Sequence, residues 1–361
     1  MRKITTAYPK IAIIVLNWNK WEHTLRCLES LYQISYPNYS IIVVDNGSTD
    51  GSLEKMEDWA KGKIPIEGKY FEYNPDGKPI NHVVYDGSKI ELVTSNNKEP
   101  GHSYDNKKLI IIKYKQSLGY PKANNIAIRY VFDVLNLHYV LIMHNDMVVA
   151  PNFLDELINA ANKRPDAGII ASKIYSYTEP DGELWSEGGL LNYWTITFLQ
   201  RGPKLTARTE GKDIIEMDWV PLACTLISRQ VYQTVGMIDE AFSWGLEEID
   251  FSIRVSRRGL KVLFVPKSHI WHDNERSLEY QKEVLPRQVY NTSRGTLILL
   301  QKHWHGLQLV SAITFYILKN IKYVFLFLLR SREWNNARLY LRGFLDHWKE
   351  RRSHKQDSDN A

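Results

Sequence analysis

Cysteine is scarce in this chain: Cys27 and Cys224 are the only two among 361 residues. Two cysteines make no disulfide framework and no zinc site, so we expect a reducing compartment and two inert core thiols. The sequence also lacks a Gly-x-Gly-x-x-Gly fingerprint and a Gly-Lys-Ser or Gly-Lys-Thr tripeptide. Both a dinucleotide-binding fold and a P-loop enzyme are therefore disfavoured.

Long apolar runs are also missing. Residues 11–16 are too few for the apolar core of a signal peptide and lead directly into polar residues 17–19, so we expect no export signal. Residues 307–329 are strongly apolar but are interrupted by two lysines and an asparagine, whereas a transmembrane helix needs about 20 predominantly apolar residues. For this segment we expect two amphipathic helices in the plane of a membrane surface.

The remaining composition is that of a folded protein. Hydrophobic residues make up 44% and charged residues 24% of the chain, which allows a sizeable core. The length fits one large domain or two ordinary ones. The 11 tryptophans and 21 tyrosines suit a surface that handles sugars, bases or lipid interfaces.

Strand and helix patterns alternate from the N-terminus onward. Residues 11–16 and 41–44 are continuous apolar runs, which predict strands buried on both faces, and an apolar stripe at helical spacing lies between them. Polar loops, 17–20 and 45–52, follow both strands. This order predicts an α/β fold with a mostly parallel central sheet, flanked by helices, and a ligand crevice at the strands' carboxyl ends.

The second of these loops is a candidate nucleotide contact. Asp45 ends its strand, where a carboxylate can accept hydrogen bonds from a ribose or a base. Gly47 and Gly51 allow tight backbone turns close to a ligand. A plain Asx turn followed by a helix cap explains the same residues, so both interpretations stay open.

A third apolar run, 139–143, ends abruptly in His144, Asn145 and Asp146. A carboxylate placed at the end of a parallel strand can hold a hard divalent cation against a phosphate. The alternative is that Asp146 caps the helix that begins near Asn152.

An acidic cluster marks the start of a later helix. Glu247, Glu248 and Asp250 fall where the helix dipole favours anions, and Gly259 supplies the C-terminal stop. Like charges disfavour each other's ionisation, so we expect Glu247 and Asp250 to raise the pKa of Glu248, which suits a general base. A solvated first turn is the alternative.

Three further segments are interpreted from composition. Residues 61–108 are polar and rich in glycine, asparagine and proline, and predict an irregular hairpin insertion without chemistry. Residues 185–221 hold three tryptophans and are the candidate lining of an acceptor pocket. Residues 267–273 predict a loop that brings His269 and His272 to the end of a strand.

Several of these segments together resemble a known family. Their order and spacing are similar to those of family 2 glycosyltransferases, most closely the rhamnosyltransferase-like branch. The similarity runs from about residue 9 to residue 303 and is interrupted at 61–108. Six segments carry it: 13–19 (IIVLNWN), 42–52 (IVVDNGSTDGS), 117–125 (SLGYPKANN), 141–149 (LIMHNDMVV), 236–240 (GMIDE) and 247–250 (EEID).

The resemblance implies a GT-A fold, a nucleotide-sugar donor such as a UDP- or dTDP-sugar, and inversion at the anomeric carbon. Asn17, Asn19 and Asp45 would contact the nucleoside. Asn125 would lie near the donor, beside which we also expect His144 and Asn145. The resemblance implies no nucleic-acid partner.

It also implies a divalent cation, Mg or Mn. Asp146 corresponds to the last acid of the family's Asp-x-Asp motif, which binds the metal and the diphosphate, and His272 to a histidine that completes the metal site in some members. Glu248 occupies the position of the catalytic base, with Glu247 beside it. Trp219 and Asp250 are weaker candidates for acceptor binding.

Two positions depart from the family pattern. His144 stands where the first Asp of Asp-x-Asp is expected, so donor contacts change and metal affinity is expected to be weaker. Glu248 stands where Asp is more usual, so a longer side chain must reach the acceptor hydroxyl.

The predicted function is inverting, metal-assisted transfer of a sugar to a hydroxyl of a glycan or lipid-linked glycan acceptor, with a carboxylate as general base. A nucleotidyltransferase acting on sugar phosphates would share the nucleotide and metal handling. A non-catalytic module that binds glycans or nucleotides is the third possibility, motivated by His144.

We expect a catalytic domain over residues 1–305 and a membrane-associated helical tail over 306–361. Residues 302–355 contain eleven Lys or Arg and three Asp or Glu, a net charge of +8, whereas the whole chain carries +5. Positive charge beside an apolar surface suits anionic lipid headgroups, so we expect a cytoplasmic protein, peripheral at the inner face of the cell membrane. A helical pair packed on the catalytic domain or across a dimer is the alternative.

Overall fold

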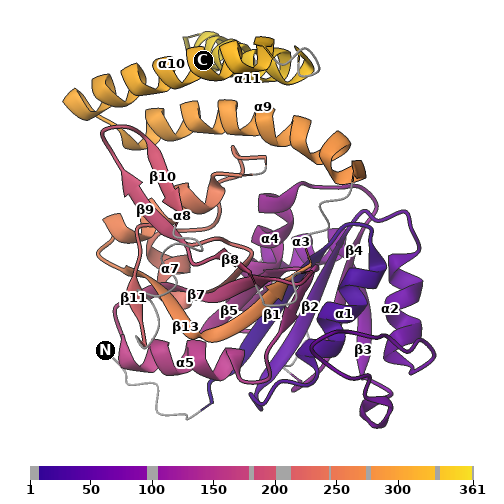
Figure 1. Ribbon diagram of the computed structural model, residues 1–361. Coiled ribbons are helices and arrows are strands. Elements are labelled where there is room, and N and C mark those ends of the chain that lie inside the picture. The colour runs from indigo at the N-terminus through magenta and orange to yellow at the C-terminus, as the bar shows by residue number, and fades with distance from the viewer. Residues whose placement is uncertain are drawn as a thin grey trace.

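One mixed β-sheet organises the part of the chain that the computed structural model describes, which is residues 8–95, 105–178, 183–200, 213–243, 245–273, 278–329 and 334–359. Helices cover both faces of the sheet, and three long helices lie across one end (Figure 1). The strand order is β11-β13-β7-β12-β5-β1-β2-β4-β3, with β6 paired to β13 and β8 to β7. The predicted α/β fold with a central sheet is confirmed.

The N-terminal half of the sheet is parallel throughout. The strands are β1 (Ile11–Asn17), β2 (Tyr39–Asn46), β3 (His82–Asp86), β4 (Leu109–Tyr114) and β5 (Tyr139–His144). The helices between them are α1 (Trp21–Leu31), α2 (Ser52–Ala60), η1 (Pro75–Gly77), α3 (Gly87–Ser95), α4 (Tyr120–Arg129) and η2 (Tyr130–Val134).

The C-terminal half contains antiparallel pairs, because β12 runs opposite to both of its neighbours, β5 and β7. Its strands are β6 (Met147–Val149), β7 (Ala167–Ser176), β8 (Leu184–Ser186), β11 (Ile215–Glu216), β12 (Cys224–Ser228) and β13 (Lys261–His272). Its helices are α5 (Phe153–Lys163), α7 (Arg229–Thr234) and α8 (Glu247–Arg257). A separate hairpin pairs β9 (Gly189–Asn192) with β10 (Thr197–Gln200).

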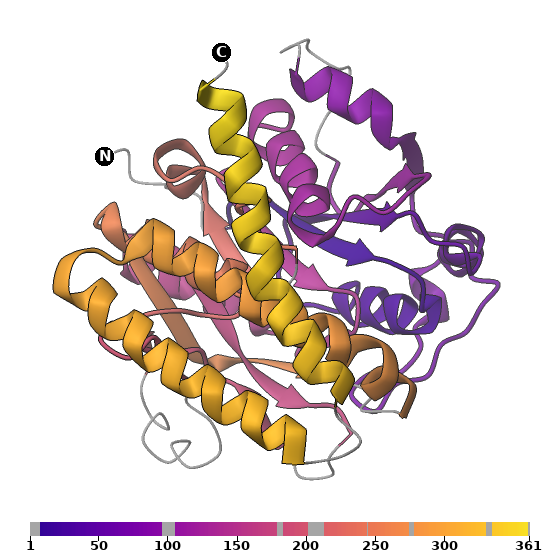
Figure 2. The same cartoon turned by 90° about the horizontal axis from the view of Figure 1, so that it is seen from above.

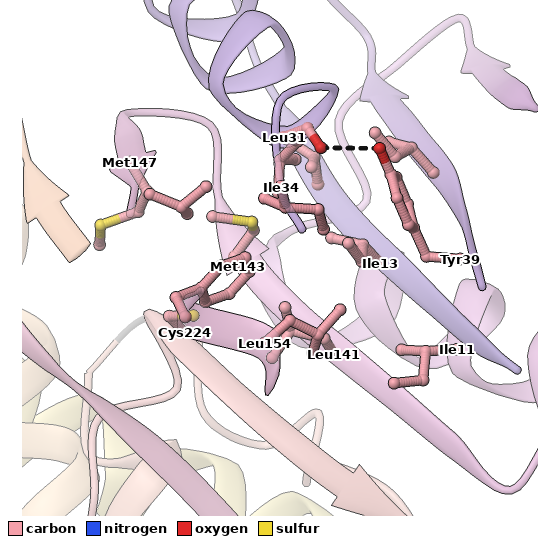
Figure 3. Close-up of a cluster of buried hydrophobic side chains, with 14 of the residues drawn as sticks. Ile11, Ile13, Leu31, Ile34, Tyr39, Leu141, Met143, Met147, Leu154 and Cys224 are labelled. Atoms are coloured by element: carbon pink, nitrogen blue, oxygen red, sulfur yellow. Dashed lines mark hydrogen bonds between the residues drawn. The ribbon is translucent and has the colours of Figure 1, made fainter. Parts of the chain in front are cut away.

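Apolar side chains fill both faces of the sheet. Ile11, Ile13 and Leu141 point from β1 and β5 into the core under α1, α2 and α5 (Figure 3). In this layer the Tyr39 hydroxyl donates a hydrogen bond of 2.9 Å to the Leu31 carbonyl. The alternate residues of the same strands pack against α4, α7 and α8 on the other face. Continuous apolar runs fit these strands because both of their faces are buried.

Two segments differ from the predicted structure. The segment expected to be a hairpin instead joins the main sheet, because β3 pairs in parallel with β4 and is followed by α3. Residues 89–93 alternate like a strand, yet five residues are too few to separate a period of two from a helical period. The predicted loop 267–273 is also largely strand, because β13 continues through a register shift after Val265 to pair with β6 and β7. Residues 96–104 lie outside the described part of the chain.

After α9 (Leu278–His303), the predicted C-terminal extension is helical and consists of α10 (Gly306–Leu329) and α11 (Trp334–Asp359). The expectation of two helices within residues 307–329 is wrong: this segment is the single helix α10, because no proline or glycine interrupts it. Seen from above, α11 crosses α9 (Figure 2). Trp304 and Ala312 pack with Phe242, which precedes α8, and with Ile249 of α8, so the C-terminal helices share a core with α8. Within the described ranges, no helix is long and apolar enough to span a membrane.

Candidate active site

The carboxyl ends of β1 and β2 hold a network of polar side chains. Parallel register sets Asn17 opposite Asp45, and the Asn17 amide donates to the Asp45 carboxylate and to the Ser48 hydroxyl, at 3.0 Å each. Asn19 adopts a left-handed backbone (φ 58°), and its side-chain oxygen accepts a 2.9 Å hydrogen bond from the Thr49 amide. The three residues predicted to contact a nucleoside therefore lie together.

Gly47 makes this loop possible. Its φ is +80°, and a Cβ at this position would lie 2.6 Å from the backbone carbon of Gln116 and the nitrogen of Ser117. The loops after β2 and β4 thus touch backbone to backbone. The neighbouring Asn46 side chain joins them further by accepting a 2.7 Å hydrogen bond from the Leu118 amide.

Asn125 and Asn145, also predicted to lie near the nucleotide-sugar donor, have different surroundings. Asn145 donates to the Asn17 side-chain oxygen at 3.2 Å and to the Thr24 hydroxyl at 2.9 Å, so it belongs to the same network. Asn125 is 1% exposed, and its amide is hydrogen-bonded to the backbone of Ile238 in both directions, at 2.8 and 3.1 Å. The structure therefore shows Asn125 fastening the segment before α8 to α4.

His144, Asp146 and His272 converge between β5 and β13. The Nε2 atom of His272 lies 3.1 Å from Oδ2 of Asp146, and Nδ1 of His144 lies 3.9 Å from Oδ1. Asn152 precedes α5 and no side chain caps this helix, so the alternative that Asp146 is its cap is wrong. Residues remote in the sequence thus form one cluster.

The electrostatics of this cluster suit a cation. Burial alone would raise the pKa of Asp146, but the imidazoles of His272 and His144 outweigh it and hold that pKa well below its usual range. Burial lowers the pKa of His144 to about 4, which leaves its imidazole neutral near pH 7. Oδ1 of Asp146 is buried without a hydrogen-bond partner. A carboxylate with an unpaired oxygen between two imidazoles fits a divalent first-row metal.

Asp273 connects this cluster to helix α1. The Asp273 amide donates a 2.8 Å hydrogen bond to the Asp146 carbonyl. The Asp273 carboxylate in turn contacts His23 at 3.1 Å and Arg26 at 2.9 Å. Sequence reasoning assigned these three residues no role, although Asp273 directly follows His272 and the other two lie three apart on α1.

Glu247 and Glu248 begin α8, after Leu246 in a left-handed conformation (φ 71°). Glu247 is 5% exposed, and its Oε2 atom has no hydrogen-bond partner, whereas Glu248 is half-buried. Burial raises the pKa of both carboxyls, and the negative charge of Glu248 raises the pKa of Glu247 further. Glu248 is therefore the first of the pair to ionise.

Asp250 has a different role from the one predicted for it. Its buried carboxylate pairs with Arg254 at 2.7 Å, Lys302 at 2.6 Å and His303 at 2.8 Å. Burial alone would raise the pKa of Asp250, but the hydrogen bond from His303 and these cations hold the pKa well below its usual range. The expectation that Glu247 and Asp250 raise the pKa of Glu248 is wrong. Burial raises it instead, Glu248 acts on the pKa of Glu247, and the charge of Asp250 is compensated. Its burial leaves no exposed surface for an acceptor.

Tyr120, to which we assigned no role from sequence, links the acidic pair to the His144 cluster. Its ring lies edge-on to the His144 ring, with centroids 5.4 Å apart, and its hydroxyl donates to the Leu222 carbonyl at 3.0 Å. Burial, followed by the carboxylates of Glu247 and Glu248, raises the pKa of Tyr120 well above its usual value. Tyr120 lies within segment 117–125, one of the six segments that carry the family resemblance, and this position could have marked it as a candidate site residue.

Two tryptophans of the predicted acceptor region are placed differently. Trp185 is half-buried and lies edge-on to the His272 ring, with centroids 4.5 Å apart. Trp219 is 7% exposed and packs in the core beside Ile249. Trp185 therefore borders the cluster directly, and residues 201–212 of this region lie outside the described ranges.

Sequence comparisons relate the chain to glycosyltransferases. Family models match residues 12–81 (glycosyl transferase family 2) and 83–291 (glycosyltransferase like family 2). The O-antigen biosynthesis protein RfbC of Myxococcus xanthus is 26% identical over 54% of this chain, and the match covers 15% of RfbC. The N-acetylglucosaminyl-diphospho-decaprenol L-rhamnosyltransferase of Mycobacterium tuberculosis is 21% identical over 74% of this chain and 77% of its own length.

Solved structures show the same fold. GalNAc-T7 with UDP, GalNAc and Mn2+ superposes with a TM-score of 0.53 at 15% identity, covering 82% of this chain and 49% of that one. Mannosyltransferase PcManGT of Pyrobaculum calidifontis, in complex with GDP-Man and Mn2+, gives a TM-score of 0.52 at 11% identity, with 94% and 75% coverage. The protein has the GT-A fold, and by its matched segments it belongs to glycosyltransferase family 2.

Proposed function

We propose that this glycosyltransferase moves a sugar from a nucleoside-diphosphate donor to a hydroxyl of a glycan or lipid-linked glycan, with inversion and with help from a divalent cation. One observation carries the proposal: polar side chains at the carboxyl ends of β1, β2 and β5 meet the end of β13 at the Asp146–His272 pair, 3.1 Å apart. Ligands of open α/β sheets bind at this edge.

The donor would lie across the ends of β1, β2 and β5. We assign Asn17, Asn19 and Asp45 to the nucleoside, because their loops touch one another and present amide and carboxylate groups. His144 and Asn145 would border the diphosphate. Asn125 supports the site indirectly through its hydrogen bonds to the segment before α8.

Asp146 and His272 would hold the cation. When bound, Mg2+ or Mn2+ stabilises the negative charge of the departing diphosphate. The Oδ1 atom of Asp146 supports this assignment, because it is a buried acceptor without a hydrogen-bond partner and a cation would satisfy it.

Glu248 would accept the proton of the attacking hydroxyl. Its half-buried carboxylate ionises before that of Glu247, and burial raises its pKa, which increases its strength as a base. Glu247 lies deeper and would keep its proton, so the pair carries a single negative charge. A positioned base contributes about 10²–10⁴-fold to such a reaction.

The acceptor class follows from the relatives. One acts in O-antigen biosynthesis and another transfers rhamnose to a diphospho-decaprenol-linked sugar, so a cell-envelope glycan precursor is the acceptor that we propose. Trp185 is placed beside His272 and can stack on a sugar ring. Trp219 is buried and is the weaker candidate.

A membrane surface is the proposed partner of α10. Its inner face packs through Leu309, Ala312 and Tyr316, while eight other apolar side chains of its described part are exposed: Leu307, Val310, Ile313, Phe315, Ile317, Leu318, Ile321 and Phe325. Exposed cations lie along α10 and α11: Lys319, Lys322, Arg338 and Arg342. An apolar face edged by cations fits anionic lipid, as in a peripheral protein at the inner face of the cell membrane.

The experiment is an assay of the purified protein with Mn2+, a panel of nucleotide sugars, and glycan or lipid-linked acceptors. Release of nucleoside diphosphate together with a glycosylated acceptor is the expected result. Release of pyrophosphate would identify a nucleotidyltransferase instead. Binding of a nucleotide sugar without turnover on any acceptor would identify a binding module.

A further inference from the structure

The cluster at the ends of β5 and β13 contains one more potential ligand than the pair assigned above. One ligating atom each of His144, Asp146 and His272 can be chosen so that all three lie within 4.8 Å of one another. Asp146 is the shared partner: Oδ2 faces His272 at 3.1 Å, and Oδ1 faces His144 at 3.9 Å. The two imidazole rings have centroids 6.0 Å apart.

His144 and Asp146 are close but do not form a hydrogen bond. A separation of 3.9 Å is too long for a hydrogen bond, and Oδ1 is buried with no other partner. An unsatisfied buried carboxylate oxygen is unfavourable. Two atoms that each lie about 2.1 Å from one first-row cation are at most about 4.2 Å apart. The separations of 3.1 and 3.9 Å therefore fit an ion that Asp146 binds through both carboxylate oxygens.

The surroundings hold the ring of His144 in place. The edge-on Tyr120 ring, with centroids 5.4 Å apart, packs against it, and Trp185 packs against His272 in the same way at 4.5 Å. The main chain of Asp146 is held by the amide of Asp273, which donates to its carbonyl. Both imidazole rings are therefore packed in place by aromatic neighbours, and the backbone that carries the carboxylate is held as well.

We propose that His144 is the third protein ligand of the cation, and that the resulting set of two imidazoles and one carboxylate makes this enzyme prefer Mn2+ to Mg2+. Mg2+ demands oxygen ligands, whereas imidazole nitrogen suits first-row transition metals. The inference rests on the proposed function only in placing a cation at this cluster.

Metal binding by the full-length, metal-free protein tests it without donor or acceptor. Bound Mn2+ is measured from loss of the electron paramagnetic resonance signal of the free ion, and Mg2+ by its displacement of Mn2+. We expect Mn2+ to bind the wild type more tightly than Mg2+. His144→Ala should weaken Mn2+ binding by more than about tenfold, the smallest loss typical of residues that merely support a ligand.

Two further variants complete the test. His144→Asp keeps three ligands but replaces nitrogen with oxygen, so the preference for Mn2+ over Mg2+ should narrow. His138→Ala changes an exposed histidine just before the amino end of β5 and should bind both ions like the wild type. Circular dichroism of the metal-free variants checks that each is folded.

Unchanged Mn2+ affinity in folded His144→Ala, or an unchanged preference in His144→Asp, overturns the inference. So does a wild type that binds Mg2+ as tightly as Mn2+, or binds neither ion. A protein that binds Mn2+ through His144 but releases no nucleoside diphosphate in the transfer assay rejects the proposed function and leaves the inference standing.

Discussion

Two neighbouring glutamates at the start of α8 differ in their surroundings. Glu247 and Glu248 are neighbours, yet their burial differs: the first is 5% exposed and the second is half-buried. Burial raises the pKa of both carboxyls, and the charge of Glu248 raises the pKa of Glu247 further, so Glu248 ionises first. The resemblance had already pointed to Glu248 by its position, and the difference in exposure is an independent physical argument for the same residue.

The first prediction concerns this base. Glu248→Gln removes the proton acceptor, so kcat should fall by about 10²–10⁴-fold while the affinity for the nucleotide donor stays near that of the wild type. A base acts when deprotonated, and burial raises the pKa of Glu248. Activity should therefore fall as the pH decreases through a pKa above the ordinary range of glutamate.

Steady-state kinetics over a pH series, with donor affinity from calorimetry, measures both effects. Glu54→Gln makes the same change at an exposed position in the first turn of α2 and should leave the kinetics unaltered. Near-normal turnover of Glu248→Gln would reject the assignment.

The second prediction concerns Gly47. Both Gly47 and Gly51 have φ near +80°, but a Cβ would meet the backbone of residues 116 and 117 only at Gly47. Gly51→Ala should therefore cost about 1–2 kcal/mol in unfolding free energy, from the left-handed conformation alone. Gly47→Ala should cost more and should also weaken nucleotide binding. Unfolding free energies are measured by urea denaturation. Equal decreases for the two variants would show that the contact between Gly47 and the backbone of residues 116 and 117 does not affect stability.

At the scale of whole elements, α10 has two unlike faces. Ala312 and Tyr316 are buried against the rest of the protein, whereas Leu307, Val310 and Ile321 are more than half exposed. Helix-spaced exposure of large apolar side chains along one element marks an interaction surface. The buried face of α10 agrees with the alternative prediction that this helix packs on the catalytic domain. The membrane proposal concerns only its exposed face.

The third prediction tests the outer face. Ile321→Glu places a negative charge on it, so the fraction of protein that co-sediments with anionic lipid vesicles should fall, and high salt should lower wild-type binding. Leu92→Glu makes a similar change on α3, where the side chain is 61% exposed, and should bind vesicles like the wild type. Wild-type protein that stays in the supernatant with every vesicle composition would refute the membrane proposal.

For the molecule as a whole, a buried ionic cluster joins the C-terminal helices to the catalytic domain. Asp250 of α8 is fully buried and binds Lys302 and His303 at the end of α9, as well as Arg254 on its own helix. The predicted boundary at residue 305 falls directly after these contacts. Because Trp304 also packs beside α8, we propose that the helices and the catalytic domain unfold as one unit.

The fourth prediction is that Asp250→Asn destabilises the whole chain. Removing one member of a buried ion cluster leaves the others uncompensated, so the unfolding free energy should fall by about 3–5 kcal/mol at neutral pH. The pKa of Asp250 is lowered in the folded protein. Its contribution is therefore present above an ordinary pKa of about 4 and is lost as the pH decreases through the folded value, where the variant and the wild type should converge.

Urea denaturation at several pH values measures this difference. Asp213→Asn removes an aspartate that pairs with Lys163 and Lys267 on the surface, and it should change stability little because water screens exposed ion pairs. An Asp250→Asn chain as stable as the wild type at neutral pH would contradict the proposed coupling.

Much of the parallel sheet and of the crevice could be predicted from local patterns. The apolar runs that became β1, β2 and β5 are continuous because both of their faces are buried, and the polar residues that end them are Asn17, Asp45 and His144. Parallel strands bring their carboxyl ends to one edge, so adjacency of these residues followed from the fold class. Family motifs then supplied Glu248 and His272.

Other features depend on contacts that no local pattern encodes. Residues 89–93 alternate like a strand but form α3, because packing of Ile90 in the core decides their conformation. Asp250 resembled a member of an acidic active-site cluster until the end of α9 was found to supply its cations.

By itself, the sequence determined the fold class, the family and the polar edge of the sheet, since periodicity and motif spacing are properties of neighbouring residues. Only the tertiary structure decided that His144 joins Asp146 and His272, that Tyr120 packs against His144, and that Asp273 holds the main chain of Asp146. The physical reason is that charge compensation, burial and metal ligation depend on distances between side chains, and in this chain the decisive partners come from strands and helices far apart in the sequence.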